Sequence, residues 1–219
     1  MISDAEFQRR ITQLLLDALD GRGFALAGAG AIRAHGLTDR PTADIDLFCG
    51  PRMSETDFSA AVDLGARALR DAGYEVAHVR GFSTFARLRA VDDGRMFEVD
   101  FAMSWRADPP VRLSVGPVLS ERDAVAGKLG AVYSRGEIRD FLDLDAIRCS
   151  GRYTDETLLD LGVEHDAGFD RRIFAAQLSR VMDIRPSLTE QYDVTGEAFA
   201  AIQQRLFDWA LRLRDEEKG

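Results

Sequence analysis

Two aspartates separated by one residue have the spacing that a metal-binding site on a β-strand requires. Asp44 and Asp46 flank Ile45 within residues 40–48, which read Arg-Pro-Thr-Ala-Asp-Ile-Asp-Leu-Phe. In a β-strand the side chains at positions i and i+2 lie on one face, roughly 7 Å apart along the strand, so both carboxylates would point the same way. Carboxylate oxygens are ligands that hard cations such as Mg²⁺ prefer. The pair therefore predicts a metal site on one face of a strand.

A third aspartate lies in a similar apolar setting further along the chain. The alternation of residues 95–103 places Asp100 on the face opposite the phenylalanines and on the same face as Glu98. Residues 92–94, Asp-Asp-Gly, are a hairpin turn signal that separates this segment from the strand before it. We expect Asp100 to contribute a third carboxylate to the metal site of the Asp-x-Asp pair.

A turn of small residues precedes the Asp-x-Asp pair. Gly28 and Gly30 belong to a Gly-Ala-Gly-Ala sequence between an expected strand, residues 24–27, and a helix. The free N–H groups at the start of a helix suit a phosphate tail, and glycine lets the backbone approach it closely. Thr42 would point the same way as Asp44 if the strand begins that early, and its hydroxyl would then contact phosphate or metal.

These residues suit a reaction of a nucleoside triphosphate. Such a substrate needs metal ions, about 4 Å apart, that neutralise its phosphates and align the attacking and leaving oxygens. Asp44, Asp46 and Asp100 would supply ligands for two Mg²⁺ ions. Asp100 is also placed to accept the proton of an attacking hydroxyl, but we expect metal ligation first.

The apolar periodicity predicts the elements that position these residues. At 219 residues and 46% hydrophobic content, the chain can form one large domain, or one domain with a smaller helical one. Spacing of two indicates strands and spacing of three to four indicates helices. We expect strands at residues 24–27, around 44–46, and at 74–80, 85–91 and 95–103, and helices at about 4–19, 28–35, 54–72, 120–134, around 139–144, and at 154–161, 169–182 and 195–214.

The later helices carry further charged residues of interest. Lysine is rare in this chain, and the two lysines are Lys128 and Lys218. Lys128 falls on the expected helix 120–134, and the next helix carries Asp140 and Asp143. Spacing alone does not say which face of each helix turns toward the sheet.

The order of these elements resembles the nucleotidyltransferase superfamily related to DNA polymerase beta. Residues 40–48, together with Lys128 and residues 139–144, Arg-Asp-Phe-Leu-Asp-Leu, are similar to the AbiEii type of nucleotidyltransferase toxin, which includes the MenT-like toxins of actinobacteria. The resemblance covers roughly residues 20–148. Ala29 departs from the pattern, because many relatives carry Gly-Gly or Gly-Ser in the turn.

The resemblance implies an α+β fold in two parts. A small, mixed and twisted β-sheet flanked by helices would form a nucleotidyltransferase core over residues 1–118. A mainly helical region over residues 119–219 would contribute Lys128 and Asp140 or Asp143 to the cleft. Lys128 would act as a point charge on the triphosphate, and one of the two aspartates would orient it or contact the incoming substrate.

The implied activity is transfer of a nucleoside monophosphate from an NTP to an acceptor hydroxyl with release of pyrophosphate. The resemblance further implies a toxin of a toxin–antitoxin pair, with tRNA as the acceptor and an antitoxin protein as partner. Three alternatives stay open: a small-molecule nucleotidyltransferase of the antibiotic-modifying kind, a catalytically inactive nucleotide-binding module, and, more weakly, a glycosyltransferase that holds a nucleotide-sugar.

Charge and composition argue against several other classes of protein. The formal net charge of −9 argues against a surface that attracts nucleic acid as a whole, although a local basic groove is compatible with it. We expect Arg87, Arg89 and Arg95 to lie on a solvated face, with RNA binding as the alternative role. Cys49 and Cys149 fit reduced, partly buried thiols rather than a disulfide framework or a zinc site. Without a leader-like N-terminus or a membrane span, the sequence favours a cytosolic protein without membrane contacts.

Overall fold

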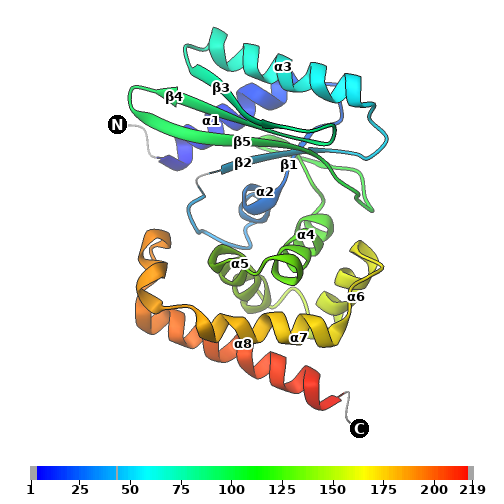
Figure 1. Ribbon diagram of the computed structural model, residues 1–219, viewed down its shortest axis with the longest axis vertical. Helices are drawn as coiled ribbons and strands as arrows, with labels where there is room; N and C mark the ends of the chain where they lie inside the picture. The colour runs from blue at the N-terminus through cyan, green and yellow to red at the C-terminus, as the bar shows by residue number, and fades with distance from the viewer. Residues whose placement is uncertain (1–3, 43, 217–219) are drawn as a thin grey trace. The chain divides into compact units, whose positions relative to one another are not determined.

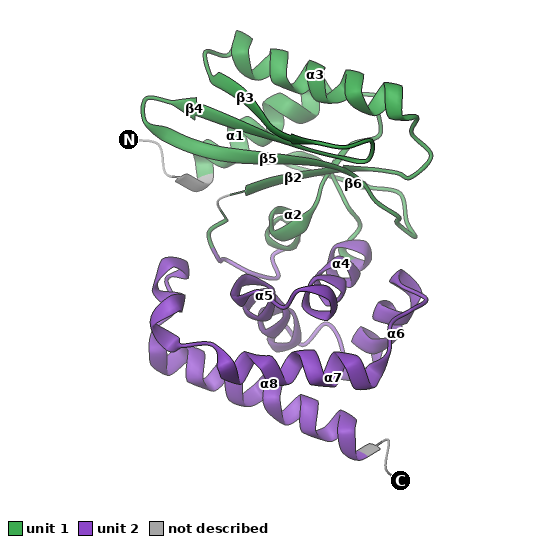
Figure 2. Cartoon of the chain, viewed as in Figure 1, with its two compact units in different colours: residues 1–34, 41–121 green, residues 35–40, 122–219 purple. Residues whose placement is uncertain are grey.

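The computed structural model describes residues 4–42 and 44–216 (Figure 1). Ala43, inside the Asp-x-Asp segment, and Lys218 lie outside the described residues. The chain divides into two compact units, residues 1–34 with 41–121 and residues 35–40 with 122–219 (Figure 2). Each unit is described by itself.

The first unit contains a mixed sheet of seven strands in the order β3-β4-β5-β2-β1-β7-β6. The β2–β5 and β1–β7 pairs are parallel and the other pairs are antiparallel, which confirms the predicted mixed sheet. The strands are β1 (Ala25–Leu26), β2 (Asp44–Cys49), β3 (Glu75–Gly81), β4 (Phe85–Asp92), β5 (Arg95–Met103), β6 (Val111–Leu113) and β7 (Gly116–Val118).

Helices cover both faces of this sheet. Figure 1 shows α1 (Asp4–Ala18) and α3 (Glu55–Asp71) on one face and α2 (Gly28–Ala34) on the other. Gly65 lets α3 approach closely, because a Cβ there would lie 2.9 Å from the Phe101 ring. Leu47 pairs in register with Phe101, so the apolar residues of β2 face the same core.

The hairpin formed by β6 and β7 was not predicted from the sequence. Each strand has only three residues, too few for a period of two to stand out. β7 nevertheless extends the sheet, because Val118 pairs with Leu26 of β1. The turn at residues 92–94 agrees with the prediction, with Asp93 at φ 43° and Gly94 at φ 80°.

The second unit is helical and has its own aromatic core. The rings of Phe174 and Trp209 lie 5.3 Å apart and join α7 to α8, and Phe169 packs on Phe174. The predicted helix 169–182 is divided into α7 and a 3₁₀ turn, and Pro186 opens a second 3₁₀ turn. The elements are α4 (Glu121–Ser134), α5 (Ile138–Cys149), α6 (Asp155–His165), α7 (Arg171–Ser179), η1 (Arg180–Asp183), η2 (Pro186–Tyr192) and α8 (Gly196–Glu216).

The segment between α2 and β2 belongs to the helical unit. The sequence places residues 35–40 in the first part, but Arg40 forms an ion pair with Asp143 at 2.8 Å. Arg152 also donates a hydrogen bond to the carbonyl oxygen of His35 at 3.1 Å. The two units are therefore connected by more than one crossing of the chain.

The two cysteines lie in different environments. Cys49 and Cys149 are free thiols, but only Cys49 is buried and Cys149 is exposed. Burial raises the pKa of the Cys49 thiol to about 11.

Within residues 4–42 and 44–216, none of the helices combines the length and the apolar composition that a membrane span needs.

Candidate active site

The Asp-x-Asp pair and the third aspartate lie on adjacent strands. β2 and β5 are parallel and pair Asp46 with Asp100, while β5 and β4 pair Asp100 with Arg87. Residues paired in register point to the same face, and neighbouring strands lie about 4.8 Å apart. One row across the sheet therefore carries Asp46, Asp100 and Arg87 side by side.

A second row of charged residues lies next to the first. Asp44 pairs with Glu98, and Glu98 pairs with Arg89. Both rows lie on the sheet face that carries α2, because Gly28, at the start of that helix, lies against Asp46. The predicted convergence of the carboxylates on one face follows from this register.

Gly28 and Asp46 are in unusually close contact. Gly28 has φ +54°, and a Cβ at this position would lie 1.8 Å from Oδ2 of Asp46. Just before it, the Ala27 N–H donates to the Asp46 carbonyl oxygen at 2.8 Å. Both the backbone conformation and the space require glycine here.

The other residues of the turn have different surroundings. A Cβ on Gly30 would lie 2.8 Å from Cδ1 of Leu26, so this glycine allows α2 to pack on β1. Ala29 is buried. β2 begins at Asp44, so the condition for Thr42 to point with Asp44 is not met. The Thr42 hydroxyl instead donates to the Asp44 carbonyl oxygen at 3.0 Å and accepts from Gln8 at 3.2 Å.

Arg87 binds the third aspartate directly. Its Nε and Nη2 each lie 2.6 Å from an oxygen of Asp100, and Nη1 lies 2.8 Å from Glu98. The hydrogen bond to Asp100 is the main cause of a raised Arg87 pKa, and the charges of Glu98 and Asp44 add to it. Of the three arginines expected to be solvated, Arg95 is exposed, whereas Arg87 and Arg89 are only partly exposed because they pair with carboxylates. Arg89 pairs with Glu98 at 2.8 Å, and Arg95 lies over the ring of Phe7.

The carboxylates fit a divalent cation by donor type. Asp44 and Asp46 are half-buried oxygen donors on one face of β2, the ligand chemistry that Mg²⁺ prefers. In the described part of the chain, however, no three His, Cys, Asp or Glu side chains are placed together to hold an ion. Arg87 donates a hydrogen bond to each oxygen of Asp100, so this guanidinium would compete with a metal ion for the carboxylate.

The predicted residues of the helical unit form a buried ionic cluster. Lys128 Nζ lies 2.8 Å from Asp143 and 3.7 Å from Asp140. Arg40 donates two hydrogen bonds to Asp143, at 2.8 and 2.9 Å, and Arg135 donates two to Asp140, at 2.8 and 3.0 Å. Lys128, Asp140 and Asp143 are buried. Burial opposes ionisation of Asp140, but its contacts with Arg135 and Lys128 outweigh this and lower its pKa.

The structure thus groups the predicted residues into two sets. Asp44, Asp46 and Asp100 share a sheet face in the first unit, and Lys128 contacts both helical aspartates in the second. Three arginines bind these carboxylates, and the sequence did not reveal their roles. They are Arg40, Arg87 and Arg135. For Arg87 the signal was present, because an arginine on the strand before the Asp-Asp-Gly turn falls opposite Asp100 once the hairpin register is counted.

A mixed β-sheet flanked by helices presents an Asp-x-Asp pair and a third aspartate on one face, beside an obligatory glycine at a helix start, and a family model assigns such a chain to the nucleotidyltransferases. The family model described as "Nucleotidyl transferase AbiEii toxin, Type IV TA system" matches residues 11–213. The chain therefore belongs to the AbiEii nucleotidyltransferase toxin family. Membership implies an NTP substrate and a cognate antitoxin.

Solved structures show the same fold. MenT4, a nucleotidyltransferase toxin from Mycobacterium tuberculosis H37Rv, is 22% identical with a TM-score of 0.56, over 95% of this chain and 84% of that chain. A putative nucleotidyltransferase from Helicobacter pylori is 16% identical with a TM-score of 0.51, over 97% of this chain and 99% of that chain. A search of curated proteins gave no match.

Proposed function

We propose that the chain transfers a nucleoside monophosphate from an NTP to a hydroxyl of tRNA in the cytosol, in a reaction that needs Mg²⁺ and releases pyrophosphate. The observation that carries this proposal is the register that places Asp46 beside Asp100, with Asp44 one row away and Gly28 against Asp46. The acceptor oxygen would form a bond to the α-phosphorus while the bond to the pyrophosphate oxygen breaks.

The residues of the first unit have distinct proposed roles. Asp44 and Asp46 would hold the metal, with Asp100 as a further ligand or as the acceptor of the hydroxyl proton. Bound there, two divalent cations would neutralise the triphosphate and align the attacking and leaving oxygens. The backbone of Gly28 and Gly30 would contact the triphosphate tail.

The helical cluster has a proposed role in nucleotide binding. Among its five side chains there are three cations, Arg40, Lys128 and Arg135, and two carboxylates, Asp140 and Asp143. The excess of positive charge supports a contact between Lys128 and the triphosphate. Asp143 holds both Lys128 and Arg40, which favours Asp143 over Asp140 as the aspartate that orients the lysine.

The test is a transfer assay with labelled NTPs. Each α-labelled NTP is incubated with the purified chain, Mg²⁺ and total tRNA, and label on RNA is measured with and without a chelator. Asp46→Ala is expected to abolish labelling and growth inhibition. Asp63→Ala, at an exposed position on α3, is the matched control and should behave as the unmodified chain.

Three results would contradict the proposal. Label that enters aminoglycosides instead of tRNA would identify a small-molecule nucleotidyltransferase. Growth inhibition that persists in Asp46→Ala would separate toxicity from this site. NTP binding by calorimetry without transfer to any acceptor would indicate a catalytically inactive nucleotide-binding module.

A further inference from the structure

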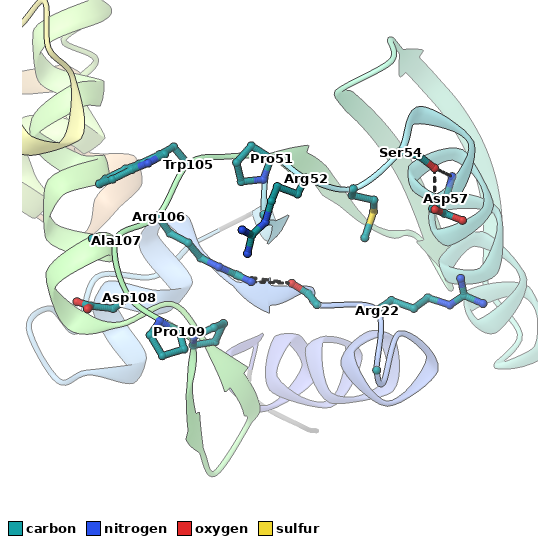
Figure 3. Close-up of a pocket in the computed structure, with 15 residues that line it drawn as sticks. Arg22, Pro51, Arg52, Ser54, Asp57, Trp105, Arg106, Ala107, Asp108 and Pro109 are labelled. Carbon is teal, nitrogen blue, oxygen red and sulfur yellow. Dashed lines mark hydrogen bonds between the residues drawn. The ribbon is translucent and has the colours of Figure 1, made fainter.

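A hollow of about 890 Å³ lies in the first unit, where three loops meet (Figure 3). Residues 21–23 precede β1, residues 50–54 follow β2, and residues 105–110 follow β5. At about 3.3 Å per residue, Gly50 lies roughly 13 Å beyond Asp46 along β2. The hollow is therefore separate from the carboxylates of the candidate active site.

Each of the three loops brings an arginine to this hollow: Arg22, Arg52 and Arg106. Arg106 donates to the Gly23 carbonyl oxygen at 3.4 Å, and a Cβ on Gly50 would lie 3.7 Å from its Nη2. Figure 3 shows both Arg52 and Arg106 extending into the hollow. In the part of the chain that the structure describes, neither Arg22 nor Arg52 forms an ion pair. An anion between these like charges would relieve their repulsion.

The acidic residues of the hollow do not neutralise these arginines. Asp57 accepts a hydrogen bond from Ser54 Oγ at 2.7 Å, and its N–H donates to the same oxygen at the start of α3. Figure 3 shows Asp108 pointing away from Arg52 and Arg106. The hollow is thus a locally basic site on a chain of net charge −9.

An exposed aromatic residue lies at the edge of the hollow, and Figure 3 shows the Trp105 ring extending away from Arg52 and Arg106. Trp105 precedes Arg106 and is 45% exposed, an unusual exposure for so large an apolar side chain. Pro51, Pro109 and Pro110 line the same hollow and restrict the loops that carry these residues. Arginines with an exposed aromatic are the combination by which proteins hold single-stranded nucleic acid, because every base can stack on an aromatic face.

We propose that this hollow binds single-stranded RNA, with a phosphate between Arg52 and Arg106 and a base stacked on Trp105. An acidic protein segment would also satisfy the arginines, but it would gain less from the indole. This binding site goes beyond the proposed transfer reaction and uses none of its carboxylates.

The test measures RNA binding without NTP or metal, so a failure of the transfer reaction does not affect it. Fluorescence anisotropy follows a short fluorescein-labelled single-stranded RNA of mixed sequence on the full chain over a series of salt concentrations. Arg52→Ala and Arg106→Ala should each weaken binding about tenfold, the value of one charge-assisted contact. Each should also reduce the slope of log affinity against log salt by about 0.7 if one phosphate contact is lost.

Trp105→Ala separates stacking from charge. It should weaken binding about fivefold or more while leaving the salt slope unchanged. Arg67→Ala, an exposed arginine of α3 outside the hollow, is the control and should bind as the unmodified chain. Circular dichroism of each variant checks that it is folded.

Three outcomes would overturn the proposal: no RNA binding by the unmodified chain, unchanged affinity in both arginine variants, or an unchanged affinity in Trp105→Ala together with equal binding of a polyglutamate peptide. The last would indicate an acidic protein partner.

Discussion

At the scale of single residues, Arg87 and a metal ion would compete for the same two oxygens of Asp100. We predict that Arg87→Gln binds Mn²⁺ about tenfold more tightly than the unmodified chain, because removing one charge-assisted interaction frees the carboxylate. Isothermal titration calorimetry measures the affinity without any turnover. Arg89→Gln is the matched control, because Arg89 lies on the same strand but pairs with Glu98. Equal or weaker binding by Arg87→Gln would show that Arg87 positions Asp100 rather than competing for it.

The contact between Gly28 and Asp46 gives a second prediction at this scale. Gly28→Ala should abolish transfer, because its Cβ must displace the Asp46 carboxylate, and should lower the free energy of unfolding by about 1–3 kcal/mol. Gly73→Ala is the control, since Gly73 also has a positive φ, +97°, but has no atom within 4 Å of the added Cβ. Urea denaturation and the transfer assay measure the two effects. If both variants retain transfer, the close approach to Asp46 has no catalytic consequence.

At the scale of elements, the buried cluster joins α4, α5 and the segment 35–40. Asp143→Ala should lower the free energy of unfolding by about 3–5 kcal/mol, because it leaves Lys128 and Arg40 without their shared carboxylate. Asp160→Ala, at an exposed position of α6, should change it little. Chemical denaturation gives both values. If Asp143→Ala changes the free energy of unfolding only slightly, the cluster serves ligand binding rather than folding. Any loss of activity in this variant would then come from the lost ligand contact and not from unfolding.

The same cluster predicts a dependence of stability on pH. The contacts of Asp140 lower its folded-state pKa below the ordinary 3.8, so its contribution is present above that value and lost as the pH falls through the folded-state pKa. The difference in unfolding free energy between the unmodified chain and Asp140→Asn should therefore stay constant above about pH 5 and shrink as the pH falls from there through the folded-state pKa. Asp155 also has a lowered pKa, but it is present in both proteins and cancels. A difference that stays constant with pH would contradict this prediction.

At the scale of the whole molecule, the features that the sequence predicted correctly are the helices and strands whose ends depend on local pattern. β5 begins and ends at the predicted residues, and α3 lies within one residue of its expected ends, because their apolar periodicity is strong and their ends are marked by turn or cap residues. The same alternation placed Asp44 and Asp46 on one face of β2, while the position of Asp100 beside them depends on the β2–β5 register. The β6–β7 hairpin was missed because short strands carry little pattern.

Other features depend on contacts between residues distant in the sequence, and local pattern carries no information about them. The role of Gly28 depends on where β2 lies relative to α2, which no spacing within the turn reveals. Arg87 reaches Asp100 across a hairpin, and Arg40 reaches Asp143 over 103 residues. The sequence therefore identified the carboxylates but not the cations that bind them.

The pairing of Arg40 with Asp143 has a consequence for synthesis on the ribosome. Arg40 emerges long before Asp143, which lies 103 residues further along the chain, and at roughly 5–20 residues per second this stretch takes about 5–20 s to be translated. Asp44 and Asp46 leave the ribosome immediately after Arg40, while the helical unit that holds residue 40 is still being made. The segment leading into the Asp-x-Asp strand thus reaches its final anchor only late in translation, and the nascent chain carries Asp44 and Asp46 for many seconds before that anchor exists.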